Sequence, residues 1–233
     1  MARQDEPAPR ERLNRHRVLD AAVALADREG IESLSMRRLS DELGVVPMAL
    51  YKHVANKEEL LDGMVDVVVT EILSLAADGW KPAVRRRVLS ARTALLRHPW
   101  ARRAMETRTA PTPAVLAYMD SMIGIFRSGG FSVDLTHHVM HALGSRMFGF
   151  TQELFDQPRS SPVNPAAQAA MLEQLSTTYP NIVAVASGAT HDDSVVGGGC
   201  DDQFEFEFAL DLLLDGFERL HEQGWSPPGR APE

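Results

Sequence analysis

The stretch that decides the fold is SMRRLSDELGVVPMALYKH, residues 35–53. Ser35 is suited to cap a helix, because its hydroxyl oxygen can accept a hydrogen bond from an unpaired backbone N–H group. The apolar residues that follow have the spacing of one helical face: Met36, Leu39 and Leu43. Gly44 suits the left-handed conformation that often ends a helix, and Pro47 suits the first position of the next one. The stretch therefore predicts two short helices joined by a tight turn.

Two helices joined by a short glycine-containing turn are the pattern of a helix-turn-helix, whose second helix enters the major groove of DNA. We expect Leu50 to face the core. The side chains then expected to face outward are Met48, Ala49, Tyr51 and Lys52. The spacing alone fits an ordinary hairpin in an all-α core as well as it fits a DNA-binding motif.

The residues on both sides of the motif favour DNA binding. Before it, residues 14–29 have helical periodicity and end at Gly30. After it, Asn56 and Glu59 have the spacing of a capping box, which predicts a helix from Lys57 to about Ala77. The motif is therefore predicted to be one part of a three-helix unit that continues into a long fourth helix.

From residue 13 to residue 65 the chain resembles the tetracycline-repressor family of bacterial transcription regulators. The resemblance is carried by LNRHRVLDAAVALADREGIESLSMRRLSDELGVVPMALYKHVANKEELLDGMV, and above all by its run LGVxxxxLYxHVxNKxxLLD. Later runs, ALLR at 94–97 and LLLDGFERL at 212–220, resemble the branch that contains the tetracycline repressor. The resemblance implies an all-α chain in three parts: a flexible arm at 1–12, a helix-turn-helix DNA-binding domain at 13–60, and a helical ligand-binding and dimerisation domain at 61–233.

The charge of the chain does not itself indicate DNA binding. The formal net charge is −8, and residues 1–63 hold 10 Lys and Arg against 12 Asp and Glu. Positive charge that contacts phosphates must therefore be clustered. The candidates within and beside the motif are Arg37, Arg38, Lys52 and Lys57, and those that precede it are Arg10, Arg12, Arg15 and Arg17.

Composition excludes several other classes of protein. Cys200 is the only cysteine, so no disulfide can form within the chain. No apolar run has the length of a membrane helix, and the first twelve residues lack the apolar core of a signal peptide, which predicts a cytoplasmic protein. The motifs of a phosphate-binding loop, a nucleophile elbow or a zinc protease are absent, so we expect no enzyme activity and no cofactor. His137 and His141 are one helical turn apart but have no carboxylate or cysteine at matching spacing, so we expect no metal site.

Apolar periodicity predicts the remaining helices at 82–97, 99–110, 113–127, 132–154, 166–176 and 204–223, with loops at 158–166 and 186–202. Phe204, Phe206 and Phe208 alternate as in a strand, but the segment is long and its later residues keep a helical period, which favours a helix. Residues 133–155 and 204–222 are more apolar than a small monomer needs. In the family two such helices pack against their symmetry mates, so we expect a homodimer that binds a palindromic operator.

The resemblance also implies which residues contact DNA. Arg37 aligns with an arginine that reads guanine, and arginine is the commonest guanine-binding residue. Val46 stands where the family often has a capping Ser or Thr, so the first turn of the second helix can be shifted. The predicted DNA-binding residues are Arg37, Val46, Pro47, Met48, Ala49, Tyr51, Lys52, His53 and Lys57. Apolar members of this set suit thymine methyl groups, and the last four suit phosphates.

The resemblance further implies a small-molecule effector. Met105 stands where the tetracycline repressor has a metal-binding histidine, and Arg87 and Ala91 replace an asparagine and a phenylalanine that contact the drug. We therefore expect an apolar or aromatic ligand with an acidic group facing Arg87, rather than a magnesium–tetracycline chelate. The predicted ligand-binding residues are Arg87, Ala91, Trp100, Met105, Met122, Phe126, Met147, Phe150 and Glu153.

Two other functions remain open from the sequence. The chain could be an all-α enzyme or binding domain that carries an incidental helix hairpin. It could also be a regulator that activates transcription, or one that answers to a partner protein and not to a small molecule.

Overall fold

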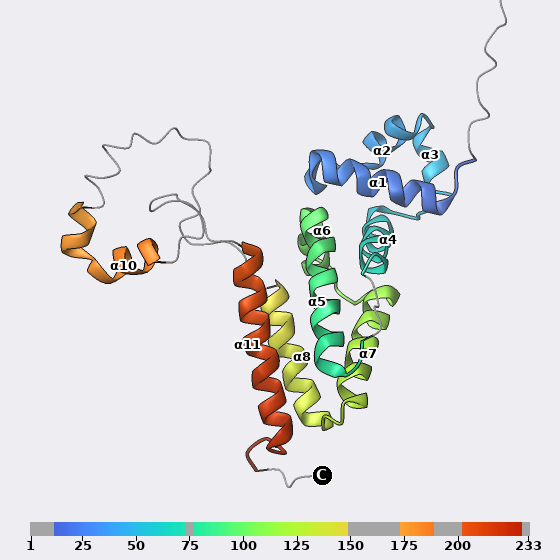
Figure 1. Ribbon diagram of the computed structural model, residues 1–233. Helices are drawn as coiled ribbons and strands as arrows, with labels where there is room; N and C mark the ends of the chain where they lie inside the picture. The colour runs from blue at the N-terminus through green and yellow to red at the C-terminus, as the bar shows by residue number, and fades with distance from the viewer. Residues whose placement is uncertain (1–11, 73–76, 149–172, 189–201, 230–233) are drawn as a thin grey trace, which may run out of the picture. The chain divides into compact units, whose positions relative to one another are not determined.

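The computed structural model describes residues 12–72, 77–148, 173–188 and 202–229, and within these ranges the regular structure is helical, without strands (Figure 1). The chain forms two compact units, residues 1–136 and residues 137–233. This division by compactness lies far from the functional boundary predicted between residues 60 and 61, which stays a prediction. No helix in the described ranges is both long enough and apolar enough to cross a bilayer.

The described residues of the first unit form these elements: α1 (Arg15–Glu29), η1 (Ile31–Ser33), α2 (Met36–Leu43), α3 (Pro47–Leu50), α4 (Lys57–Thr70), α5 (Trp80–Arg97), α6 (Pro99–Glu106) and α7 (Pro113–Ser128). Four of these helices begin at a side chain that accepts a hydrogen bond from the first turn: Asn14, Ser35, Asn56 and Thr112. Each cap satisfies one N–H group that the helix leaves unpaired. The polar residues before the apolar runs therefore set where these helices start.

The main core lies where α1, α2, α3, α4 and α6 meet. Its fully buried side chains include Val18, Leu25, Leu39, Leu50, Leu60 and Met64. Gly63 lets α1 and α4 approach closely, because a Cβ atom at this position would lie 2.6 Å from Leu19 Cδ2. Burial of these aliphatic side chains holds the predicted three-helix unit together, and it extends the same core to α4 and α6.

Two helix boundaries differ from the prediction. α4 ends at Thr70 and not near Ala77. The N–H groups of Glu71 and Ile72 pair with carbonyl groups three residues back, which tightens the last turn and ends the helix. At the other end of the loop, α5 starts at Trp80, two residues before the predicted Pro82, because proline is tolerated within the first turn.

Four further segments differ from the prediction or lie partly outside the described residues. α6 ends at Glu106, four residues before the predicted end. Of the helix predicted at 166–176, only residues from 173 onward are described, and 173–178 are helical. α10 (Pro180–Gly188) was not predicted from the sequence. α8 (Val133–Phe148) begins as predicted, and its expected continuation to residue 154 lies outside the described residues.

The last helix, α11 (Asp202–Glu222), confirms the helical interpretation of the alternating phenylalanines. Its buried side chains recur with helical spacing: Phe206, Leu210, Leu214 and Phe217. Residues 137–148 of α8 belong to the same unit and run antiparallel to α11. Arg146 near the end of α8 donates to the Glu205 carbonyl oxygen at 3.3 Å, whereas the rings of His138 and Trp225, at the opposite ends, have centroids 5.2 Å apart.

Candidate DNA-binding surface and ligand-binding site

The turn between α2 and α3 has the geometry that the sequence predicts. The Ser35 hydroxyl oxygen accepts a hydrogen bond from the Arg38 N–H group at 3.1 Å, and this bond starts α2. Gly44 lies in the left-handed region, with φ 64° and ψ 36°, where a β-carbon is costly. The Val45 N–H group then donates to the Ser40 carbonyl oxygen at 3.0 Å, which closes the turn. Pro47 occupies the first position of α3.

α3 buries one residue and exposes its neighbours. Leu50 is completely buried, as predicted. By contrast, Val46, Met48 and Tyr51 are 68%, 72% and 47% exposed, which is unusual for such large apolar and aromatic side chains. The regular helix ends at Leu50, and a turn follows in which the His53 N–H group donates to the Leu50 carbonyl oxygen. The exposed apolar and aromatic side chains therefore lie on the very short helix α3 and on the residues directly before and after it.

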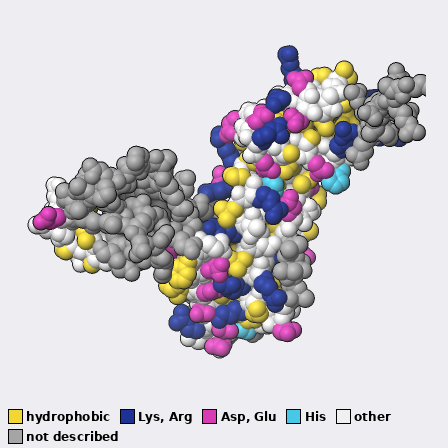
Figure 2. Space-filling model, turned by 45° about the horizontal axis from the view of Figure 1, so that its top comes forward, with side chains coloured by type: hydrophobic (Ala, Val, Ile, Leu, Met, Phe, Trp, Pro, Cys, Tyr) yellow, Lys and Arg dark blue, Asp and Glu magenta, His cyan; other side chains and the backbone are white. Residues whose placement is uncertain are grey.

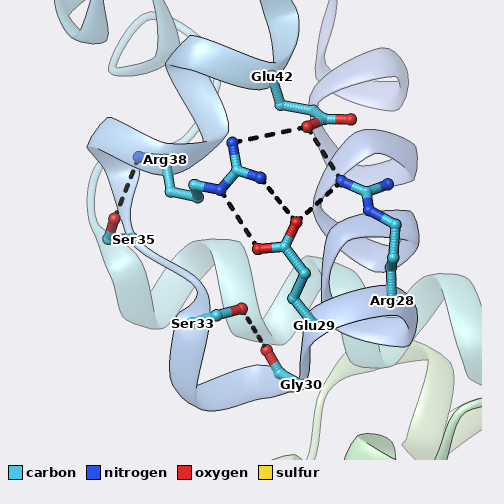
Figure 3. A network of polar contacts seen from close by, with 7 residues as sticks. All are labelled: Arg28, Glu29, Gly30, Ser33, Ser35, Arg38 and Glu42. Atoms are coloured by element: carbon cyan, nitrogen blue, oxygen red, sulfur yellow. Dashed lines mark hydrogen bonds and ion pairs between the residues drawn. The ribbon is translucent and has the colours of Figure 1, made fainter.

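The cations beside α3 fall into two groups. Among the described residues, the guanidinium of Arg37 and the ammonium groups of Lys52 and Lys57 have no hydrogen-bond or ion-pair partner, and all three side chains are exposed. Arg38 is different. Its guanidinium donates to Glu29 at 2.7 Å and lies 3.9 Å from Glu42, while Arg28 pairs with the same two carboxylates (Figure 3).

The network of Arg28, Glu29, Arg38 and Glu42 joins α1 to α2. Hydrogen bonding to Arg38 lowers the pKa of the Glu29 carboxyl group below its usual value, and the same contact raises the pKa of Arg38. The ion pairs therefore hold Arg38 against α1, whereas Arg37 on the same helix has no such partner among the described residues. The two adjacent arginines thus lie in different surroundings.

A second set of contacts fixes the turn after α3. Arg15 of α1 donates to the His53 carbonyl oxygen at 2.8 Å and to Glu59 at 2.6 Å. The Asn56 side chain caps α4, as the predicted capping box requires. The Glu59 carboxylate accepts from the N–H group of Ala55, one residue before the cap, and this bond together with Arg15 lowers its pKa. Arg15 therefore joins α1 to the turn after α3 and to α4, and its contact with phosphate stays a prediction.

Charged side chains of both signs are interspersed on the face shown in Figure 2, where Lys and Arg lie among Asp and Glu. This distribution agrees with the balanced charge of residues 1–63. No broad basic patch is seen among the described residues on that face.

Of the predicted ligand-binding residues, four lie on two neighbouring helices of the first unit. Arg87 and Ala91 are one turn apart on the buried face of α5, and Met122 and Phe126 are one turn apart on the buried face of α7. These two helices contact each other. Tyr118 of α7 was not predicted from the sequence, and the centre of its ring lies 4.8 Å from the Arg87 guanidinium carbon. Tyr118 lies one helical turn before the predicted ligand-binding residue Met122, and this spacing could have identified it from the sequence.

The other predicted ligand-binding residues are placed differently. Trp100 and Met105 pack against the main core around α1 and α4. Met147 lies on α8 in the second unit. Phe150 and Glu153 lie outside the described residues. The structure thus brings part of the predicted set together, and the whole set stays a prediction.

The rings of His137 and His141 on α8 meet edge to face, with their centroids 4.6 Å apart. In the described ranges there is no group of three or more His, Cys, Asp or Glu side chains placed to hold a metal ion.

Two family profiles match the sequence of this chain. Residues 18–64 match the profile for bacterial regulatory proteins of the tetR family, and residues 74–221 match the tetracyclin repressor-like C-terminal domain. The chain belongs to the tetR family. It is 30% identical to the HTH-type transcriptional repressor DrrR1 of Streptomyces coeruleorubidus, an alignment that covers 95% of this chain and 83% of that repressor. Family membership confirms the resemblance and the all-α fold, and it makes the chain a transcriptional regulator.

Solved structures of tetR-family proteins from Streptomyces coelicolor have the same fold. Apo ActR superposes with a TM-score of 0.69 at 26% identity, covering 91% of this chain and 98% of that one. ActR in complex with actinorhodin superposes with a TM-score of 0.65 at 27% identity, covering 90% and 98%. A protein of similar fold thus binds a small molecule.

In this tetR-family regulator a buried polar network connects α1 to α6. The ring of His98, at the junction of α5 and α6, lies between two carboxylates: Nδ1 is 2.8 Å from Asp27, and Nε2 is 3.2 Å from Glu71. The Trp100 indole N–H donates to Asp27 at 2.6 Å, and Arg97 donates to Glu71 at 2.7 Å. The sequence offered no signal for this network, because its partners are 71 and 27 residues apart for His98.

Proposed function

We propose that this regulator is a repressor that binds a palindromic operator as a homodimer in the cytoplasm and is released by a small-molecule effector. The observation that carries the proposal is the surface around α3. Large apolar side chains at Val46 and Met48 are exposed. Near them in the sequence are three cations without a partner in the described part of the chain: Arg37, Lys52 and Lys57. Apolar side chains suit thymine methyl groups in the major groove, and the cations suit guanine and phosphates.

A second exposed apolar stripe supports the homodimer. On α11, Phe204 and Phe208 are 50% and 54% exposed, their rings stack 6.5 Å apart, and Leu212 continues the stripe one turn later. Contiguous exposed apolar surface on a helix is a common mark of a protein–protein interface. A symmetric dimer formed through α11 would bury this stripe, and two copies of α3 would then read two half-sites.

Effector release requires that the ligand prefer a shape that does not fit the operator. The network of Asp27, Glu71, His98 and Trp100 is a physical route for this coupling, because it ties α1 of the DNA-binding unit to α6. A ligand that moved α6 would move α1 through these hydrogen bonds. The likeness to ActR, which has been solved with actinorhodin, supports a small-molecule effector.

The proposal is tested by binding of the purified chain to DNA from the region upstream of its own gene. We expect saturable, sequence-dependent binding of two chains per site, with an affinity that falls steeply with salt. Lys52→Ala should reduce the slope of log affinity against log salt by about one, as expected for a lost phosphate contact. Binding with no sequence preference, or no binding even at low salt, would contradict the proposal.

The assembly and the effector need separate measurements. Light scattering should give twice the mass of one chain, and Leu212→Asp on α11 should shift the protein toward monomer. A ligand that binds the folded state must raise the melting temperature, so a thermal-shift screen can find effectors. A dimer that binds DNA and responds to no small molecule would favour a regulator that answers to a partner protein.

A further inference from the structure

The side chain of Arg87 on α5 is only 8% exposed, yet it lacks a counterion in the part of the chain that the structure describes. Its Nε and Nη1 atoms are buried and have no hydrogen-bond partner there. A guanidinium does not lose its proton under physiological conditions, so the positive charge is retained. Burying an unpaired charge opposes folding, and the stability of the fold therefore does not account for arginine at this position.

Tyr118 on α7 also has a buried polar group without a hydrogen-bond partner among the described residues. The Arg87 guanidinium carbon lies 4.8 Å from the centre of its ring, and its hydroxyl oxygen is buried without a hydrogen-bond partner among the described residues. Burial raises the pKa of the Tyr118 hydroxyl to about 12, so it remains a neutral hydrogen-bond donor at physiological pH. Unpaired donors from two contacting helices thus lie beside each other.

The acidic residues of the neighbouring helix α4 already have other partners. Asp62 accepts a hydrogen bond from Arg108 at 3.1 Å, and Asp66 accepts one from the Ala114 N–H group at 3.3 Å. The buried residues nearest to Arg87 on its own helix are apolar: Val84, Val88 and Ala91. The surroundings therefore offer a fixed positive charge, a hydroxyl donor and apolar walls.

We propose that Arg87 and Tyr118 together bind a carboxylate carried by an apolar or aromatic effector. The guanidinium and the hydroxyl supply donors for the carboxylate oxygens, and the apolar side chains of α5 and α7 contact the remainder of the ligand. A charge-assisted pair in a desolvated site is stronger than a neutral hydrogen bond, which makes the acidic group the main source of selectivity. This inference rests on the proposed function, because it names the class of effector.

The test compares matched probes: benzoate, naphthoate and anthroate against their neutral carboxamides, with binding followed by tryptophan fluorescence and melting temperature. We expect the wild-type chain to bind at least one carboxylate roughly tenfold or more tighter than its carboxamide. Arg87→Met should abolish this preference, and Tyr118→Phe should reduce it. Arg86→Met, at an exposed position on the same helix, is the matched control and should leave it unchanged.

Equal binding of each carboxylate and its carboxamide, or no binding of any carboxylate to the wild type, would overturn the inference. A preference that survives in Arg87→Met would also overturn it. If circular dichroism shows that Arg87→Met does not fold, Tyr118→Phe is the deciding variant. An undiminished preference of Tyr118→Phe for the carboxylate over the carboxamide would then refute carboxylate binding by Arg87 and Tyr118. DNA binding of the unliganded wild type is measured in parallel. Its absence would refute the proposed function, whereas intact DNA binding without a carboxylate preference would refute only this inference.

Discussion

Removing the Asp27 carboxylate should destabilise the protein far more than removing another acidic side chain from the same helix. Asp27 accepts from the Trp100 indole N–H at 2.6 Å and lies 2.8 Å from His98 Nδ1. Both partners are buried, so Asp27→Ala leaves two polar groups without a partner. Each hydrogen bond to a charged group contributes about 1.5–3 kcal/mol.

The Asp27 side chain is itself 29% exposed, so water can replace part of what is lost. We therefore expect Asp27→Ala to lower the free energy of unfolding by about 2–4 kcal/mol, which corresponds to a fall in melting temperature of roughly 5–15 °C for a chain of this size. Asp27→Asn should have a smaller effect, since its amide oxygen can still accept one bond. Calorimetry and urea denaturation measure both quantities.

Asp20→Ala is the control for this prediction. Asp20 lies on α1 like Asp27, but within the described residues it pairs only with the exposed His16, so its loss should change stability by about 0.5 kcal/mol or less. If Asp27→Ala and Asp20→Ala melt at the same temperature, the network does not hold α1 to α6. If the network couples α6 to α1, Asp27→Ala should also weaken the release of DNA by the effector, while the affinity for the effector stays unchanged.

Other substitutions and titrations test separate parts of the structure. Gly63→Ala should destabilise by about 1–3 kcal/mol, because the new Cβ meets Leu19, whereas Gly124→Ala, which meets open space, should be neutral or stabilising in the same melting assay. The pKa of Glu59 is lowered in the folded state, so the ionised carboxylate stabilises the fold above the unfolded-state pKa, and this contribution is lost as the pH falls through the folded-state pKa. We expect Glu59→Gln to make the melting temperature less sensitive to acid. An unchanged dependence of the melting temperature on acidic pH would contradict this. The folded-state pKa of Tyr118 is raised to about 12, so stability should fall as the pH rises from about 10 toward 12, and tyrosinate absorbance should show a late step that is absent from Tyr118→Phe.

Local signals in the sequence predicted the DNA-binding part well. The helix-turn-helix depends on interactions over a few residues: the cap at Ser35, the left-handed Gly44 and the proline that starts α3. Such interactions leave a pattern that can be recognised in order along the chain. The helical assignment of α11 was also predictable, because its periodicity extends over many residues.

What the sequence could not supply depends on contacts between distant residues. Nothing local distinguishes Arg37, which is unpaired among the described residues, from Arg38, which pairs with carboxylates of α1 and α2. The end of α4 at Thr70 was likewise hidden, because apolar periodicity continues beyond the tightened last turn. Tyr118 gained its significance only when α5 and α7 were brought together.

In the proposed function, residues around α3 read operator DNA. The most direct measurement is the affinity of wild type, Arg37→Ala and Arg86→Ala for the operator and for an unrelated duplex of equal length. Arg86 is exposed on α5, so its variant carries the same change of charge away from α3. We predict that Arg37→Ala weakens binding to the operator by about 1–3 kcal/mol and reduces the ratio of operator affinity to affinity for the unrelated duplex. Arg86→Ala should change neither the operator affinity nor this ratio. Equal losses in both variants, or an operator preference that Arg37→Ala leaves intact, would contradict the claim.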